Sequence, residues 1–236
     1  TNPNLQNISR SDKEQAFYIR SLFLPKNKDW IIIEADLKGC EVSGAACHTL
    51  DNNLIAYVSD SSLDMHRDIG EILYKVDKSL ISKDLRSITK TYTFGSFYGS
   101  YWKLTGPYLF KQINMQQPKL TDGTPVIDYL KSVGLGTLED FTAQTQVADN
   151  YLWNEQFPQY TQWKRDVVAK YNETGYVDMF TGFRRYGPMN NKQVVNTPIQ
   201  GDSGHINLWM CLYVLNRLHN SGIPAELFLQ IHDSIV

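Results

Sequence analysis

Two short apolar runs near opposite ends of the chain place the strongest constraint on its fold. Residues 30–35, Trp-Ile-Ile-Ile-Glu-Ala, predict a buried strand that ends at Asp36. Residues 227–236 predict two strands separated by a polar break at His232 and Asp233. Segments with helical periodicity occupy most of the chain between these runs. Short strands mixed irregularly with many helices are typical of an α+β fold rather than a doubly wound sheet.

The helical segments differ in how clearly the sequence marks them. Apolar periodicity predicts helices at residues 41–58, 64–74, 83–98, 141–171 and 201–219. Residues 105–137 contain seven glycines and prolines, which predicts an irregular insert that runs over the surface as a loop.

Composition excludes several classes of protein. The net charge of −2 gives no overall basic field, so any binding of nucleic acid must come from local patches. The three cysteines, Cys40, Cys47 and Cys211, are odd in number and widely spaced. That pattern argues against a disulfide scaffold and a zinc site, and for a reducing compartment. No apolar stretch approaches roughly 18 residues and no signal-peptide pattern is present, so we expect a cytoplasmic protein without a membrane partner.

Asp36 and Asp233 each follow an apolar strand. If the two strands pair in one sheet, both carboxylates reach the same edge. Carboxylate oxygens are preferred ligands of hard divalent cations, and two such ions roughly 3.5–4 Å apart can activate an attacking hydroxyl and stabilise a leaving oxygen. Each aspartate could also simply end its strand in a turn.

Arg86, Lys90, Phe94 and Tyr98 recur at four-residue intervals in the predicted helix at residues 83–98. Each such step advances about 40° and 6 Å, so the four side chains form one stripe along the helix. Two cations followed by two aromatic rings match the phosphates, sugar and base of a nucleoside triphosphate. An amphipathic helix with a solvated basic end and an aromatic core end would show the same spacing.

The region around this stripe is basic. Residues 75–103 carry six lysine or arginine side chains and two aspartates, an excess of four positive charges in a chain of net charge −2. Such a surface favours a polyphosphate or a nucleic-acid backbone, although a solvated helical face has the same composition.

Three segments resemble, in order, the signature motifs of family A (DNA polymerase I-type) DNA polymerases. The first has Asp36 and, five residues later, Glu41. The second is the stripe itself, with Gly95 and Gly99 at the family's positions. The third is Gln-Ile-His-Asp at residues 230–233. Further blocks resemble the family at residues 2–8, 64–66, 182–186 and 196–201.

The resemblance implies a role for each matching residue. Asp36 and Asp233, with the main-chain carbonyl of Leu37, would hold two Mg²⁺ ions, and Lys90 would act as a catalytic proton donor to pyrophosphate. The expected nucleotide-binding residues are Glu41 (a steric gate against a ribose 2′-hydroxyl), His66, Arg86, Lys90, Phe94 and Tyr98. The expected DNA-binding residues are Asn4, Gln6, Asn7, Arg184, Gln200 and His232. The sequence departs from the family at Ser234, where a glutamate is usual, so we assign Ser234 no metal.

The resemblance also implies the palm and fingers of a right-hand polymerase. We expect residues 1–74 to form the first part of the palm, residues 75–174 the fingers with the insert near 105–137, and residues 175–236 the second part of the palm. The sequence reads as a piece of a longer protein, possibly from a phage or other virus, with a thumb and possibly an exonuclease domain elsewhere. It identifies no processivity factor.

The expected function is template-directed DNA synthesis by a two-metal mechanism, with primer–template DNA and dNTPs as partners. Two alternatives stay open. A single-subunit RNA polymerase shares the palm and the spacing of Arg86 and Lys90, but Glu41 argues against it because a bulky carboxylate at the sugar rejects ribonucleotides. A non-catalytic nucleic-acid-binding remnant would not need both Asp36 and Asp233.

Overall fold

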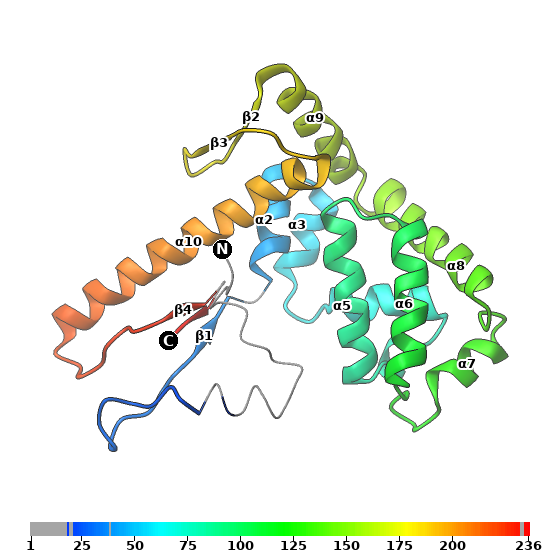
Figure 1. Cartoon of the computed structure of the whole chain (residues 1–236), viewed down its shortest axis with the longest axis horizontal. Helices are drawn as coiled ribbons and strands as arrows, with labels where there is room; N and C mark the ends of the chain where they lie inside the picture. Colours follow the sequence, from blue (N-terminus) through cyan, green and yellow to red (C-terminus); the bar gives the residue numbers. More distant parts are fainter. Residues whose placement is uncertain (1–17, 19–20, 38, 232–233) are drawn as a thin grey trace. The chain divides into compact units, whose positions relative to one another are not determined.

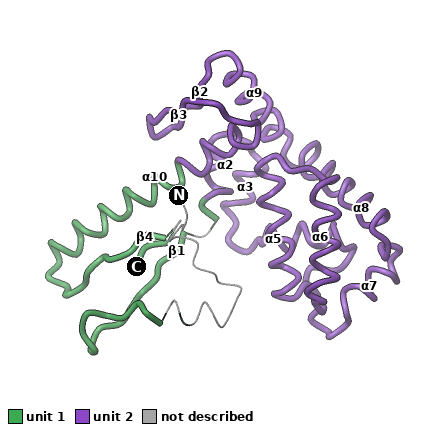
Figure 2. Tube along the Cα trace, in the orientation of Figure 1, with its two compact units in different colours: residues 1–40, 202–236 green, residues 41–201 purple. Residues whose placement is uncertain are grey.

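The structure is a computed structural model that describes residues 18, 21–37, 39–231 and 234–236 (Figure 1). The chain divides into two compact units (Figure 2). Unit 1 consists of residues 1–40 and 202–236, and unit 2 of residues 41–201. The two units are defined by contacts within the chain and do not test the expected boundaries between palm and fingers. Those boundaries, after residues 74 and 174, stay a prediction.

Unit 1 contains a small antiparallel sheet. Strand β1 (Ala35–Asp36) pairs with β5 (Ser234–Ile235), which also pairs with β4 (Gln230–Ile231). The β4–β5 hairpin confirms the two strands predicted in residues 227–236. Helix α10 (Asn191–Ser221) begins in unit 2, and its residues 202–221 belong to unit 1.

The predicted buried strand at residues 30–35 is wrong except at its end. Only Ala35 and Asp36 form β1, and Ile31, Ile32 and Ile33 are 80%, 41% and 68% exposed. The strand pairing gives the reason: in the described part of the chain, β5 pairs with β1 only at Ala35 and Asp36, and residues 31–33 have no paired strand beside them.

Unit 2 is mainly helical in its described part. Its α-helices are α2 (Cys40–Thr49), α3 (Asn52–Ser59), α4 (Met65–Tyr74), α5 (Lys83–Phe97), α6 (Trp102–Gln116), α7 (Val126–Ser132), α8 (Leu138–Asn150) and α9 (Pro158–Thr174). A 3₁₀ turn (Lys78–Leu80) and a π-helical segment (Tyr151–Gln156) join some of them, and β2 (Tyr176–Asp178) pairs with β3 (Arg184–Tyr186) in a hairpin. None of the helices that the structure describes is both long and apolar enough to cross a membrane.

Helices α4 and α5 confirm the periodicity predicted at residues 64–74 and 83–98. Residues 41–58 form two helices, because Leu50 takes a left-handed φ of 51° and Asp51 caps α3. The Asp51 carboxylate accepts hydrogen bonds from the backbone N–H groups of Asn53 and Leu54, as a helix N-cap does.

The prediction that residues 105–137 form an irregular loop is wrong. They contain most of α6 and all of α7, and α6 packs along α8. Leu109 and Ile113 of α6 are fully buried, and a Cβ at Gly106 would lie 3.1 Å from Cα of Thr142 on α8. Pro107 lies in the second turn of α6, where it removes one backbone donor. Packing against α8 therefore outweighs the local preference of glycine and proline for turns.

One face of α5 is anchored in the core of unit 2. Leu85 and Tyr92 are buried there, together with Tyr74 of α4 and Phe141 of α8. Burial of each such side chain contributes about 1.5–3 kcal/mol, so these contacts hold α5 firmly in place. The buried carboxylate of Asp149 accepts hydrogen bonds from the Tyr92 hydroxyl and, at 2.6 Å, from the backbone N–H that opens α6. The opposite face of α5 carries the predicted stripe.

Candidate nucleotide-binding site

The stripe on α5 forms a continuous surface. Arg86, Phe94 and Tyr98 are half-buried and Lys90 is exposed. Lys90 Nζ lies 5.4 Å from the centroid of the Phe94 ring, and the Phe94 and Tyr98 rings stack with their centroids 6.5 Å apart. The structure therefore keeps the order of two cations and two rings that the four-residue spacing predicts.

The N-terminus of α4 lies against this stripe. Asp64 caps α4 through Oδ1, which accepts from the backbone N–H of His66 at 3.2 Å. Its Oδ2 accepts from Nε of Arg86 at 2.7 Å. The His66 and Phe94 ring centroids are 5.6 Å apart. The structure thus brings together five of the six predicted nucleotide-binding residues, His66, Arg86, Lys90, Phe94 and Tyr98, and adds Asp64.

Hydrogen bonds define the state of His66. The Thr93 hydroxyl donates its proton to the carbonyl of Thr89 at 3.0 Å, so its oxygen is left to accept from Nδ1 of His66, 3.2 Å away. In the neutral ring, Nε2 then carries a lone pair. Burial, the largest cause, and the positive charges of Arg86 and Lys90 together lower the pKa of His66 to about 4, although the Asp64 carboxylate acts in the opposite direction. His66 is therefore neutral near pH 7.

This pKa makes stability depend on pH. The pKa of His66 in the folded state lies below its unfolded value of 6.5, so acidification protonates the unfolded chain first. The free energy of unfolding is therefore highest above pH 6.5, and part of it is lost as the pH falls towards 4. Because the ring keeps some contact with water, we expect a loss of about 2 kcal/mol. His66→Gln should remove that pH-dependent loss, as measured by urea unfolding between pH 4 and 7, whereas the exposed His219→Gln should retain it. The same slope in His66→Gln as in the wild type would contradict this.

A second group of predicted residues meets at the C-terminal end of α5. Gln200 Nε2 donates to Glu41 Oε1 at 3.3 Å, across a sequence separation of 159 positions. Burial first, and then the nearby Glu41 carboxylate, raise the pKa of the Tyr98 hydroxyl above its ordinary value. Glu41, the expected steric gate, is therefore a neighbour of Tyr98, an expected nucleotide-binding residue, and of Gln200, an expected DNA-binding residue.

The expected metal site belongs to unit 1. Asp36 is the last residue of β1 and is exposed, and Leu37 follows it. Asp36 pairs with Ser234, the residue that follows Asp233 in sequence. The expected site residues outside the described part of the chain are Asn4, Gln6, Asn7, His232 and Asp233. Within the described part, no three His, Cys, Asp or Glu residues gather in a way that could hold a metal ion.

Arg184, an expected DNA-binding residue, is held by its own hairpin. Its Nε forms an ion pair with Asp178 at 2.7 Å, and its guanidinium lies 3.8 Å from the Tyr176 ring centroid. Lys170 of α9 also contacts Asp178, at 2.8 Å. Arg185 donates to Thr197 at 2.8 Å. Arg184 and the α5 stripe are thus positioned by separate sets of contacts.

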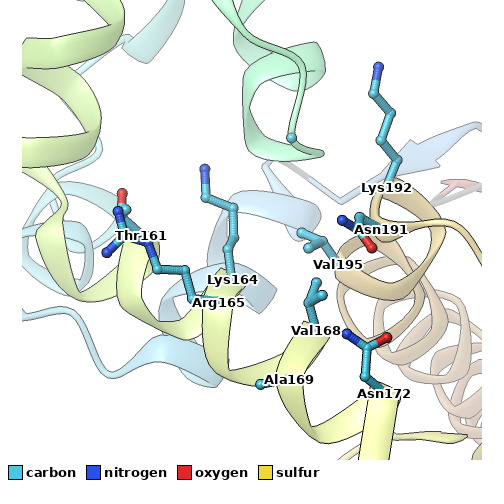
Figure 3. Close-up of a pocket in the computed structure, with 10 residues that line it drawn as sticks. Thr161, Lys164, Arg165, Val168, Ala169, Asn172, Asn191, Lys192 and Val195 are labelled. Carbon is cyan, nitrogen blue, oxygen red and sulfur yellow. The ribbon is translucent and has the colours of Figure 1, made fainter. Parts of the chain in front are cut away.

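A pocket of about 520 Å³ lies between α9, the start of α10 and Gly99 (Figure 3). Its lining includes Lys164 and Arg165 of α9 and Lys192 of α10. Lys192 Nζ donates to the Ser100 hydroxyl at 3.1 Å. Burial lowers the pKa of Lys164 to about 8, and Asp149 acts in the opposite direction. Three basic side chains make this lining favourable for an anionic group.

The sequence assigned no role to Asp64 or Thr93. Asp64 is the first residue of the helix predicted at residues 64–74, where an N-cap is expected, so its capping position could have been found. Its bond to Arg86, 22 positions away, could not.

Comparisons with known proteins decide the family. The model of DNA polymerase family A matches residues 1–118, half of the chain. The chain belongs to DNA polymerase family A. It is 28% identical over 248 residues to DNA polymerase I of Bacillus subtilis and 26% identical over 250 residues to that of Bacillus caldotenax. Each alignment covers all of this chain and 24% of the relative, so the chain spans about a quarter of the length of these polymerases.

A solved structure shares the fold. The chain matches the POL domain of Pol1 from M. smegmatis, in complex with DNA primer-template and dNTP, with a TM-score of 0.70 and 21% identity over 99% of this chain and 37% of that chain. The family predicted from the motifs and the α+β, right-hand polymerase fold are confirmed. A phage or viral origin stays a prediction.

Proposed function

We propose that the protein carrying this chain is a cytoplasmic, DNA-directed DNA polymerase that transfers a deoxyribonucleoside monophosphate from a dNTP to a primer 3′-hydroxyl. The observation that carries the proposal is the α5 surface, on which Arg86 and Lys90 are followed by the Phe94 and Tyr98 rings. That order fits the phosphates, sugar and base of a dNTP. Family membership and the similarity to a polymerase domain support it.

The side chains of unit 2 suggest how the nucleotide is held. Arg86 and Lys90 would bind the phosphates through charge-assisted hydrogen bonds, with His66 beside them. Lys90, whose ammonium is exposed, would donate a proton to the leaving pyrophosphate. Phe94 would pack on the deoxyribose, and Tyr98 would lie beneath the new base pair.

We assign the metal site to Asp36, the main-chain carbonyl of Leu37, and Asp233, with two Mg²⁺ ions. The register supports this, because Asp36 pairs with the sequence neighbour of Asp233. The Asp36 carboxylate is exposed, and carboxylate and carbonyl oxygens are the donors that suit Mg²⁺. When bound, such a metal pair supplies positive charge to the attacking 3′-oxygen and the leaving pyrophosphate.

We assign primer–template contacts to the six positions that match the family: Asn4, Gln6, Asn7, Arg184, Gln200 and His232. Gln200 is the one with a described contact to the nucleotide site, its bond to Glu41. Through this bond, Gln200 would link contact with the primer–template to sugar selection by Glu41.

Gln200→Ala should therefore weaken primer–template binding and relax sugar selection together. A variant that shows neither change would contradict the assignment.

Primer extension tests the function through Glu41. The full natural protein should extend a primer with dNTPs in Mg²⁺ and should use rNTPs poorly. Glu41→Ala opens space beside the sugar, so the ratio of kcat/KM for rNTP to that for dNTP should rise by roughly 10- to 100-fold. Glu139→Ala, a change at an acidic residue in the first turn of α8, is the matched control.

Other outcomes favour the alternatives. Equal use of rNTPs and dNTPs by the wild type would support a single-subunit RNA polymerase. Nucleic-acid binding without metal-dependent extension would support a non-catalytic remnant. An unchanged ratio in Glu41→Ala would remove Glu41 from the gate.

A further inference from the structure

Asp64 joins the helix that carries His66 to the helix that carries Arg86. Its Oδ1 accepts from the backbone N–H groups of His66 and Arg67 at 3.2 and 3.4 Å, and its Oδ2 accepts from Nε of Arg86 at 2.7 Å. The Asp64 and Arg86 side chains are 31% and 37% exposed, so the pair is partly shielded from water. Burial acts to raise the pKa of Asp64, but the hydrogen bond and charge of Arg86 outweigh it and the pKa lies below its ordinary value.

The contact leaves most of the Arg86 guanidinium available. An arginine has five N–H donors in a planar fork, and Asp64 engages the one on Nε. Within the described part of the chain, neither Nη group of Arg86 has a hydrogen-bond partner. Four donors, two on each Nη nitrogen, therefore remain available.

The neighbouring arginine is arranged differently. Arg67 Nε lies 3.6 Å from the same Asp64 oxygen, but its Nη1 donates to the backbone carbonyls of Ile81 and, at 3.3 Å, Lys78. The Nη1 group of Arg67 thus binds the segment between α4 and α5, whereas both Nη groups of Arg86 are available to bind a ligand.

A helix cap alone does not explain this arrangement. An N-cap needs one acceptor oxygen, and Asn or Ser supplies it as well as Asp does. Asp64 caps with one oxygen and binds Arg86 with the other, and the second contact is the one that uses the negative charge.

We propose that Asp64 is a positioning residue for the incoming nucleotide: it holds Arg86 by Nε and so presents the two Nη groups to the triphosphate. This inference rests on the proposed function, which makes the triphosphate the ligand of Arg86. A long side chain loses rotamer freedom when it binds a ligand, and restraint before binding reduces that loss. The same carboxylate binds the backbone N–H of His66. Asp64 therefore fixes the positions of His66 and Arg86 relative to each other, and both would face the phosphates.

The test is Asp64→Asn in the full natural protein, which keeps a capping oxygen and removes the charge. The dissociation constant for dNTP, titrated in Mg²⁺ onto a primer–template with a dideoxy-terminated primer, should rise by roughly three- to tenfold. The primer–template affinity should stay unchanged, and the melting temperature should change little, because a partly exposed ion pair contributes about 0–1 kcal/mol to stability. Asp64→Ser, which also caps, should act in the same way. Asp77→Asn is the matched control, because Asp77 caps the 3₁₀ turn and binds no arginine among the described residues.

A double-mutant cycle shows whether Asp64 acts through Arg86. Arg86→Gln should weaken dNTP binding, and Asp64→Asn should then add little, because the residue it positions is gone. Equal effects of Asp64→Asn in the two backgrounds would overturn the inference. So would unchanged or tighter dNTP binding in Asp64→Asn, since tighter binding would mean that Asp64 competes with the phosphates for Arg86. Failure of the wild type to bind dNTP would instead refute the proposed function.

Discussion

Replacing Asp36 with Asn should lower the rate of primer extension by on the order of 10³-fold while leaving primer–template affinity within about twofold. Asp233→Asn should do the same. The amide keeps the size of the side chain but removes a negative charge that the metal ions require when charge develops on the attacking and leaving oxygens. Single-turnover extension in Mg²⁺ measures the rate, and equilibrium titration with labelled primer–template measures the affinity.

The matched control for this experiment is Asp29→Asn, an exposed aspartate in the segment before β1. It should leave both measurements unchanged. Substantial Mg²⁺-dependent extension by Asp36→Asn or Asp233→Asn would remove that residue from the metal site. Loss of DNA binding together with extension would point to a folding defect at the β1–β5 edge instead.

Phe94→Tyr should reduce discrimination against dideoxynucleotides by roughly one to two decades, with little change in normal dNTP use. Phe94 lies between Lys90 and Tyr98 on α5, so its ring should face the sugar. An incoming nucleotide without a 3′-hydroxyl lacks one hydrogen-bonding group near the phosphates. The hydroxyl of a tyrosine at position 94 can supply that hydrogen bond. Losing one hydrogen bond to a charged group costs about 1.5–3 kcal/mol, which sets the size of the effect.

Competitive incorporation of ddNTP against dNTP measures this discrimination. Phe110→Tyr adds a hydroxyl to another half-buried ring, one that packs on Phe141 at 5.6 Å, and should leave discrimination as it is. Phe94 also packs against the core of unit 2. If that were its whole role, Phe94→Tyr would lower all activity together, and the ratio of ddNTP to dNTP use would not change.

The sequence by itself determined the features that repeat over a few residues. The four-residue spacing of Arg86, Lys90, Phe94 and Tyr98 predicts a helix with these side chains on one face, and α5 has both. Periodicity is sufficient here because a helix relates residues that are close in sequence. The ordered motifs likewise indicated the polymerase family without any knowledge of contacts.

The tertiary structure decided what depends on residues far apart. Residues 31–33 look like a buried strand, but burial requires a paired strand beside them, and in the described part of the chain β5 pairs with β1 only at Ala35 and Asp36. Pro107 and Gly106 favour an irregular loop, yet burial against α8 makes α6 a helix. In both segments the local preference is worth less than the tertiary contacts that are formed or missing.

The same distinction applies to the candidate site. The motifs indicate Glu41, Arg86 and Gln200 as candidate site residues. They do not indicate which side chains these residues contact. The Asp64–Arg86 and Gln200–Glu41 contacts bridge 22 and 159 positions, and they exist because packing of the helices brings those side chains within hydrogen-bond distance. Sequence spacing places a residue on a helix face, and only the packing of one helix against another determines which charge it meets.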